Sequence, residues 1–125
     1  MIIDAQSDKP IFLQIAEQLE DAIFTGIYSE GEKVPSTNEI AALLTINPHT
    51  VLKGMNLLVN EDLIHKRRGL GMFVSDGAVE KIRAKRLEQF YERYVEALVV
   101  EAEKLSMTRQ DVIALIERGF DHEGN

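Results

Sequence analysis

The sequence predicts a mainly α-helical fold with one small β-hairpin. Apolar residues recur every three or four positions through most of the 125-residue chain, which is typical of amphipathic helices. Two short segments of strand character, residues 63–67 and 72–74, are separated by a glycine-containing turn. A run without glycine or proline then extends from residue 78 to residue 118, which favours helix again. This chain length suits one compact domain, or a small domain with an extension.

The first predicted helix begins after Pro10 and ends at Gly26, because glycine readily takes the left-handed position that follows a helix. Its apolar face consists of Ile11, Ile15, Leu19 and Ile23. Lys33 and Val34 form a short extended piece, since the residue before Pro35 is restricted to extended backbone. An extended segment therefore leads into the next helix.

Two short helices follow, joined by a tight turn at residues 45–46. Ser36 and Glu39 have the spacing of a capping box, in which each side chain bonds the backbone N–H group of the other residue. Asn47 caps the third helix, and Pro48 occupies its first turn, where a missing N–H group costs nothing. We expect the inward faces of these helices to be Ile40, Ala41, Leu43 and Leu44 in the first, and Val51, Met55, Leu58 and Val59 in the second.

Two helices joined by so short a turn make a helix-turn-helix, and a hairpin placed after it makes a winged helix-turn-helix. Gly69 and Gly71 provide the turn between the two strands. We therefore assign residues 1–77 to a winged helix-turn-helix domain with the hairpin as its wing.

Residues 78–125 form the second predicted region, which contains two helices. The first is a long helix of roughly seven turns, with apolar residues at Val79, Ile82, Leu87, Tyr91, Tyr94, Leu98 and Leu105. A last short helix begins at residues 108–111 and is expected to end at Gly119.

The long helix is apolar around more than one face, and such a helix needs a second partner to cover it. We expect it to be the interface of a homodimer, formed by Leu87, Phe90, Tyr91, Tyr94, Val95 and Leu98. The alternative is that the short last helix covers the whole apolar surface.

Composition narrows the class of function. The chain has no cysteine, which excludes disulfides and cysteine-based zinc sites and fits a reducing compartment. It shows no secretory signal and no run of the roughly 20 apolar residues that a spanning helix needs, so we expect a cytoplasmic protein without a membrane partner. The histidines, His49, His65 and His122, lie on different predicted elements, without a nucleophile motif or phosphate loop. We expect no enzyme, no metal site and no cofactor.

The charge is unevenly distributed. The net charge of −7 taken alone argues against a nucleic-acid partner, because DNA binding usually needs a basic surface. However, Lys66, Arg67 and Arg68 stand together at the hairpin turn. Consecutive cations would repel one another without an anion nearby, so we favour contact with phosphate or the minor groove over a merely solvated hairpin. A second basic run, residues 81–86, reads as a solvated helix face.

The helix that begins at Asn47 has the properties of a DNA-reading helix. Its outward side chains near the start are His49, Thr50 and Lys53, and each can bond a phosphate or a base edge. The free N–H groups and partial positive charge at a helix start also favour phosphate. Gly54 weakens this helix, which a close approach to another backbone would explain. Taken singly these residues are also common on ordinary surfaces, and the specific signal is their ordered combination.

These segments together resemble the winged-helix domain of the GntR family of bacterial transcription regulators. The resemblance runs from about Lys9 to Val74, through PIFLQIAEQLEDAIFTG, VPSTNEIA, INPHTVLKGMNLLVNEDLI and RRGLGMFV. The short helical tail looks like that of the YtrA-like branch. The resemblance implies a homodimer bound to a palindromic DNA operator, commonly as a repressor. By position it implies DNA contacts at Ser36, Thr37, Asn38, Asn47, His49, Thr50, Lys53, Lys66, Arg67, Arg68, Gly69, Leu70 and Gly71.

The sequence departs from the family pattern at Asn38, where the family usually has a DNA-contacting arginine. Fewer neutralised phosphates predict a shallower salt dependence of binding than in an arginine-rich relative. Two other hypotheses remain. The winged helix could bind protein rather than DNA, which net acidity and Asn38 favour. A small-molecule effector could also occupy a pocket lined by Phe90, Tyr91, Tyr94 and Phe120.

Overall fold

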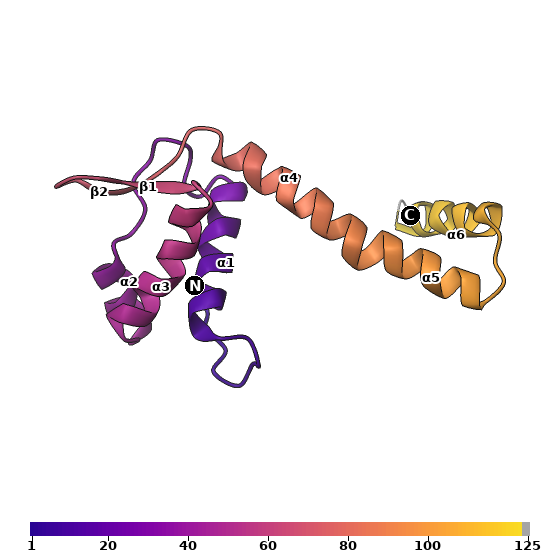
Figure 1. Ribbon diagram of the computed structural model, residues 1–125, viewed down its shortest axis with the longest axis horizontal. Coiled ribbons are helices and arrows are strands. Elements are labelled where there is room, and N and C mark those ends of the chain that lie inside the picture. Colours follow the sequence, from indigo (N-terminus) through magenta and orange to yellow (C-terminus); the bar gives the residue numbers. More distant parts are fainter. Residues whose placement is uncertain (124–125) are drawn as a thin grey trace. The chain divides into compact units, whose positions relative to one another are not determined.

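The computed structural model describes residues 1–123 and confirms a mainly α fold with one two-stranded antiparallel sheet (Figure 1). The chain divides into two compact units, residues 1–84 and residues 85–125. Each unit is described by itself below. None of the described helices is both long and apolar enough to cross a membrane.

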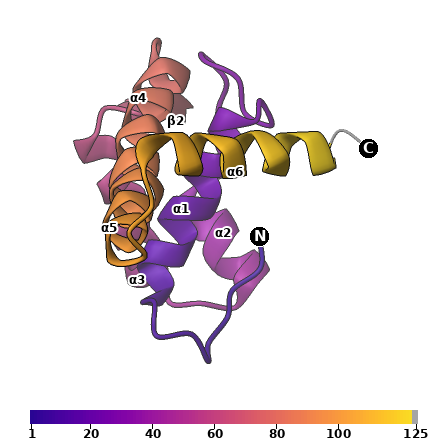
Figure 2. The same ribbon diagram turned by 90° about the vertical axis from the view of Figure 1, so that its right-hand side faces the viewer.

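Three helices form the body of the N-terminal unit. They are α1 (Ile11–Phe24), α2 (Thr37–Leu44) and α3 (Pro48–Asn60), and α3 packs against both of the others. Before α1, residues 1–10 form a loop that returns to the helix (Figure 2). Gln14 holds this loop, because its side-chain amide accepts from the backbone N–H of Asp4 and donates to the carbonyl groups of Asp4 and Lys9.

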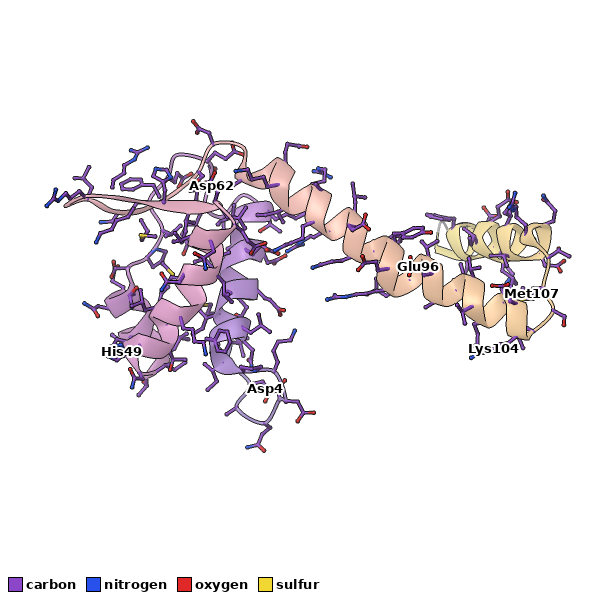
Figure 3. The ribbon with its side chains drawn as sticks, in the orientation of Figure 1. Asp4, His49, Asp62, Glu96, Lys104 and Met107 are labelled. Carbon is purple, nitrogen blue, oxygen red and sulfur yellow. The ribbon has the colours of Figure 1, made fainter. Side chains whose placement is uncertain are left out.

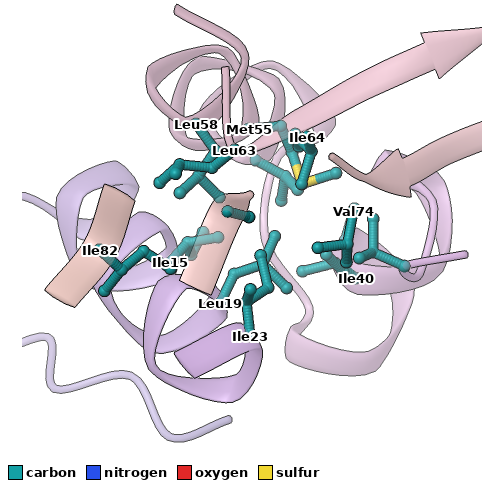
Figure 4. Close-up of a cluster of buried hydrophobic side chains, with 14 residues drawn as sticks. Ile15, Leu19, Ile23, Ile40, Met55, Leu58, Leu63, Ile64, Val74 and Ile82 are labelled. Atoms are coloured by element: carbon teal, nitrogen blue, oxygen red, sulfur yellow. The ribbon is translucent and has the colours of Figure 1, made fainter. Parts of the chain in front are cut away.

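One apolar cluster fills the space between these helices and the sheet (Figure 4). The predicted inward positions of α1 and α3 largely lie in it, as do Ile64 and Val74, which pair with each other in the sheet. Its fully buried large side chains are Ile15, Leu19, Ile23, Val34, Val51, Met55, Leu58, Leu63, Ile64, Val74 and Ile82.

Two predicted core positions are wrong. Leu43 in α2 is 76% exposed, and Val59 in α3 also lies at the surface. Each helix buries a narrower stripe than its apolar residues suggest. In α2 the burial is confined to Ile40 and Ala41, with Leu44 half-buried.

The hairpin consists of β1 (Ile64–Arg67) and β2 (Gly71–Val74), paired with Ile64 opposite Val74 and Arg67 opposite Gly71. The turn between them uses Gly69 at φ +78°, a left-handed conformation that glycine adopts readily. The extended segment before Pro35 adds a single bridge, Lys33 to Phe73. The predicted wing is therefore confirmed, and residues 33–34 widen its base.

The start of α4 (Ala78–Phe90) belongs to the N-terminal unit. Ala78 and Ile82 are buried in the same apolar cluster. The Glu30 carboxylate accepts hydrogen bonds from the N–H groups of Gly77 and Val79, at 2.7 and 3.2 Å, and so caps the helix. Lys81 also pairs with Asp62 at 2.8 Å.

The predicted long helix is present, but it is not regular. After α4 the chain continues through η1 (Tyr91–Val95), which is a π-helix, into α5 (Glu96–Lys104). The Glu96 N–H group donates to the carbonyl of Tyr91, five residues back, which is the hydrogen bond that defines a π-helix.

The last helix, α6 (Arg109–Glu123), begins where predicted and ends later. Thr108 and Asp111 form a reciprocal cap, in which each side chain accepts from the backbone N–H of the other. The prediction that Gly119 ends this helix is wrong, because α6 continues through it.

Candidate nucleic-acid interface

The start of α3 is exposed and firmly capped. The Asn47 side-chain oxygen accepts from the His49 N–H group at 2.8 Å, with Pro48 at the first helical position. His49 is exposed (Figure 3). Asn47 is exposed as well, and Thr50 is half-buried. Pro48 has no N–H group, and the N–H groups of Thr50 and Val51 donate to the Asn47 carbonyl at 3.0 and 3.3 Å. The start of α3 therefore offers its side chains and its partial positive charge to an outside partner, rather than free N–H groups.

The start of α2 is fixed by the predicted capping box. The Ser36 hydroxyl accepts from the Glu39 N–H group at 3.0 Å, and the Glu39 carboxylate accepts from the Ser36 N–H group at 3.1 Å. The backbone bond from Ser36, then the bond from its hydroxyl, and last the charge of Lys33 lower the pKa of Glu39. Ser36 and Thr37 are half-buried and Asn38 is exposed. The hydroxyl and amide groups at this helix start are therefore held at the surface.

Gly54 marks the closest approach of α3 to α1. A Cβ atom at this position would lie 2.6 Å from the carbonyl oxygen of Phe12 and 3.4 Å from side-chain atoms of Ile15. The predicted close contact with another backbone is thus present. It fixes the distance between α3 and the helix that supports it.

Lys53 lies beside this contact. Its ammonium nitrogen is 4.2 Å from the centre of the Phe12 ring, which is within the range of a cation–π interaction. The lysine side chain therefore folds back along α1 in this structure. To contact DNA, the Lys53 ammonium group would either move away from the Phe12 ring or reach a DNA phosphate from its present position.

The wing presents its basic residues at the surface. Lys66, Arg67 and Arg68 are exposed, and Leu70 at the tip is 61% exposed. The Arg67 guanidinium lies 4.4 Å from the centre of the Phe73 ring, and its Nε–H group donates to Nε2 of His65 at 3.3 Å. Arg67 is thus ordered by its own hairpin before any ligand is present.

The residues predicted to contact DNA come from three elements: the start of α2, the start of α3 and the hairpin. None of them is buried. In Figure 1 the hairpin tip, α2 and the start of α3 lie on the same side of the N-terminal unit. This side combines hydroxyl and amide groups, backbone N–H groups and cations, which are the groups that position a protein on phosphates and read base edges.

Sequence reasoning missed two aromatic supports, Phe12 under Lys53 and Phe73 under Arg67. The second had a usable signal. Residues two apart on a strand share a face, so His65 and Arg67 lie on one side, and the hairpin register places Phe73 opposite His65. The first had none, because it joins two helices that lie far apart in sequence.

The residues predicted to form a dimer interface are apolar and solvent-accessible in the single chain. Val95 is half-buried and the others are exposed: Leu87, Phe90, Tyr91, Tyr94 and Leu98. The rings of Phe90 and Tyr94 contact each other with their centres 5.3 Å apart. An uncovered apolar surface of this kind on a helix is typical of a protein interface.

An apolar cleft of about 350 Å³ lies between α5 and α6. Its lining is Leu98, Glu101, Ala102, Leu105, Met107, Val112, Leu115 and Ile116. The four aromatic residues predicted to line an effector pocket are not part of this cleft, and Phe120 is largely exposed.

A helix-turn-helix with a capped, polar second helix, followed by an exposed basic hairpin, defines a winged helix-turn-helix DNA-binding protein. Over residues 12–74 the chain matches the family described as bacterial regulatory proteins, gntR family. The chain belongs to the GntR family, and it is a DNA-binding transcription regulator.

Three similar proteins support this assignment. The chain is 30% identical over 123 residues to the HTH-type transcriptional repressor YtrA of Bacillus subtilis, covering 94% of this chain and 95% of YtrA. A GntR-family regulator from Bacteroides thetaiotaomicron has a similar structure, with a TM-score of 0.77, 29% identity, and coverage of 90% of this chain and 98% of that one. The DNA-binding domain of AraR, solved with its operator ORX1, matches 60% of this chain and 93% of its own at a TM-score of 0.54 and 26% identity.

Proposed function

We propose that this protein is a repressor that binds a palindromic DNA operator as a homodimer. Its similarity to the repressor YtrA extends over nearly the whole chain, tail included. The apolar surface of α4, η1 and α5 supports the dimer, because a single chain leaves it exposed to water. Two-fold symmetry would then place two copies of α3 in successive major grooves, and the operator would carry the same symmetry.

The three surface elements have different roles in this proposal. The start of α3, with His49, Thr50 and Asn47, reads base edges in the major groove. The N-terminus of α2 binds a phosphate through the Ser36 hydroxyl and the backbone N–H groups of the first two helical residues, Thr37 and Asn38. The wing binds the neighbouring phosphates or the minor groove through Arg67 and its basic neighbours.

One observation carries the proposal: the start of α3 and the basic hairpin tip are both exposed on one side of the N-terminal unit. A merely solvated hairpin would need no such common surface. Position 38 carries an asparagine and not an arginine, so this surface has one cation fewer. This difference lowers the affinity for DNA but leaves the geometry of the surface unchanged.

The test is selection of bound duplexes from a random DNA library with the purified full-length protein. We expect an enriched palindrome with half-sites about one helical turn apart, bound more weakly as salt rises. A winged helix that binds protein instead would enrich no sequence, and it would retain no DNA at low salt.

The variant Asn38→Arg tests the proposed role of α2, because it adds one positive charge at the start of this helix. If the start of α2 faces the DNA backbone, this variant tightens binding to the selected duplex. It also steepens the plot of log affinity against log salt by about 0.9. An unchanged slope would mean that α2 lies away from the phosphates.

A further inference from the structure

His65 lies at the base of the wing, between a buried hydroxyl group and an exposed arginine. Its Nδ1 atom is 3.0 Å from Oγ of Ser75, and its Nε2 atom is 3.3 Å from Nε of Arg67. His65 is half-buried and Ser75 is 6% exposed. The imidazole therefore connects the interior of the N-terminal unit to a cation that faces solvent.

The chemistry of these contacts fixes the proton on the ring. Arginine keeps its protons in proteins, so its Nε–H group can only donate. Nε2 of His65 must then be an acceptor with a free lone pair. A neutral imidazole carries its one proton on the other nitrogen, so Nδ1–H donates to the Ser75 hydroxyl.

The Ser75 end of this hydrogen-bonded series, Ser75–His65–Arg67, is held in place by the core. The Ser75 N–H group donates to the carbonyl of Leu63 at 2.9 Å, and the neighbouring residue Val74 is fully buried. A serine so little exposed has little access to water as a substitute partner. The ring orientation of His65 is therefore set by the core and not by solvent.

Arg67 is held from two directions. His65 binds its Nε–H group, and the Phe73 ring supports its guanidinium plane at 4.4 Å. Arginine stays protonated in proteins, so Arg67 keeps its positive charge while these contacts hold it. The terminal nitrogens carry four further N–H bonds, and they match the geometry of phosphate oxygens.

We propose that His65 is a positioning residue that orders Arg67 for its contact with DNA. The proposal rests on the proposed function, in which the wing binds the duplex. Long side chains lose rotamer freedom when they bind, and a side chain ordered beforehand loses less. His65 would thus raise affinity without contacting DNA itself.

The test uses full-length protein and a fluorescein-labelled duplex carrying the selected sequence, with binding measured by fluorescence anisotropy. We expect His65→Ala to weaken binding by about 2- to 10-fold, the range for one freed side chain. Arg67→Ala should weaken it more. The double variant should bind no more weakly than Arg67→Ala, because His65 acts only through Arg67.

Two conservative variants separate positioning from general support of the fold. Gln at position 65 places an acceptor three bonds from Cβ, as Nε2 is, and can bind Arg67. Asn reaches only as far as Nδ1 and can bind only Ser75. We expect His65→Gln to restore most of the affinity and His65→Asn to match His65→Ala. Melting temperatures by circular dichroism show which variants remain folded.

Lys66→Ala is the control, because Lys66 is the adjacent exposed cation and points to the opposite face of the strand. Its loss of affinity should multiply with that of His65→Ala. The proposal is overturned if the losses of His65→Ala and Arg67→Ala multiply in the same way, or if Gln restores no more than Asn. If the wild-type protein binds no duplex, the proposed function is overturned as well. If Arg67→Ala leaves binding unchanged, only the proposed role of His65 is overturned.

Discussion

The two units of this protein treat their apolar residues in opposite ways. The N-terminal unit buries fifteen apolar residues around one cluster, and most are inaccessible to water. Among the described residues from 85 onward, Ala102 is the one buried apolar residue, while leucine, valine and aromatic side chains remain exposed. A unit of the first kind has a core of its own. A unit of the second kind needs a further surface to cover it, which is why we expect a second copy.

The largest effect is expected from placing a charge on the exposed apolar surface around Tyr94. Tyr94→Glu places a carboxylate among apolar neighbours at the expected interface, where burying an unpaired charge is costly. We expect monomers by analytical ultracentrifugation. Affinity for the palindromic duplex should fall by roughly 10²- to 10⁴-fold, because linked binding of two half-sites is lost.

Gln110→Glu adds the same charge on α6 at an exposed polar position, and it is the control. It should leave both the dimer and the affinity unchanged. A Tyr94→Glu protein that remains dimeric would show that the two copies meet elsewhere, and the contrast between the units would need another explanation.

A matched pair of leucines compares the two units directly. Leu19 is 0% exposed in the N-terminal core and Leu87 is 64% exposed on α4. We expect Leu19→Ala to lower the free energy of unfolding by about 2–5 kcal/mol, since it leaves a cavity. Leu87→Ala should have an effect only through the dimer.

Urea unfolding at several protein concentrations distinguishes these two cases. The loss in Leu19→Ala should be the same at every concentration. The midpoint of Leu87→Ala should approach that of wild type as the protein is diluted and both dissociate. Equal, concentration-independent losses would mean that Leu87 is covered within its own chain.

The two helical glycines give a smaller effect, of opposite sign in the two units. Gly54→Ala would place a methyl group 2.6 Å from the Phe12 carbonyl oxygen, so we expect α1 and α3 to separate at a cost of about 1–3 kcal/mol. Gly119 has nothing within 4 Å, and Gly119→Ala should stabilise α6 by up to about 1 kcal/mol. Thermal unfolding of both variants checks this, and destabilisation by Gly119→Ala would contradict it.

Much of the N-terminal unit could be predicted from its sequence, because its signals are local. The Ser36–Glu39 box, the Asn47–Pro48 start and the glycine turn of the hairpin each specify backbone geometry within a few residues. Even Gly54 gave a usable signal, since a helix tolerates glycine best where a side chain has no room.

The errors arise where the outcome depends on contacts distant in sequence. Apolar periodicity marks Leu43 as inward, but it cannot show that the core ends before reaching it. Gly119 ends a helix only if the chain then turns, and here α6 continues. The amino-acid composition of the π-helical turn at Tyr91–Val95 likewise does not distinguish it from an ordinary α-helix. In the same way, burial in one chain does not reveal which exposed positions a second copy would cover.

The smallest expected effect is on the pH dependence of stability, and it concerns the caps of α2 and α6. Hydrogen bonds from Ser36 lower the pKa of Glu39, and hydrogen bonds from Thr108 lower the pKa of Asp111. A carboxyl group with a lowered pKa in the folded state contributes stability that is complete above its ordinary pKa and is lost as the pH falls towards the folded value. That loss begins at a higher pH for Glu39 than for Asp111, because glutamate has the higher ordinary pKa.

The amides in Glu39→Gln and Asp111→Asn do not take up a proton in this range, so the stability of these variants should fall less steeply with acid than that of the wild type. Urea unfolding followed by circular dichroism from about pH 6 to pH 3 would measure the slopes. The Gln variant should diverge from the wild-type curve at the higher pH, because an ordinary glutamate titrates above an ordinary aspartate. Curves parallel to wild type would mean that neither cap persists in solution. A change in Asp111→Asn alone would mean that the box at α2 is already open, although α2 begins the surface proposed to meet the DNA backbone.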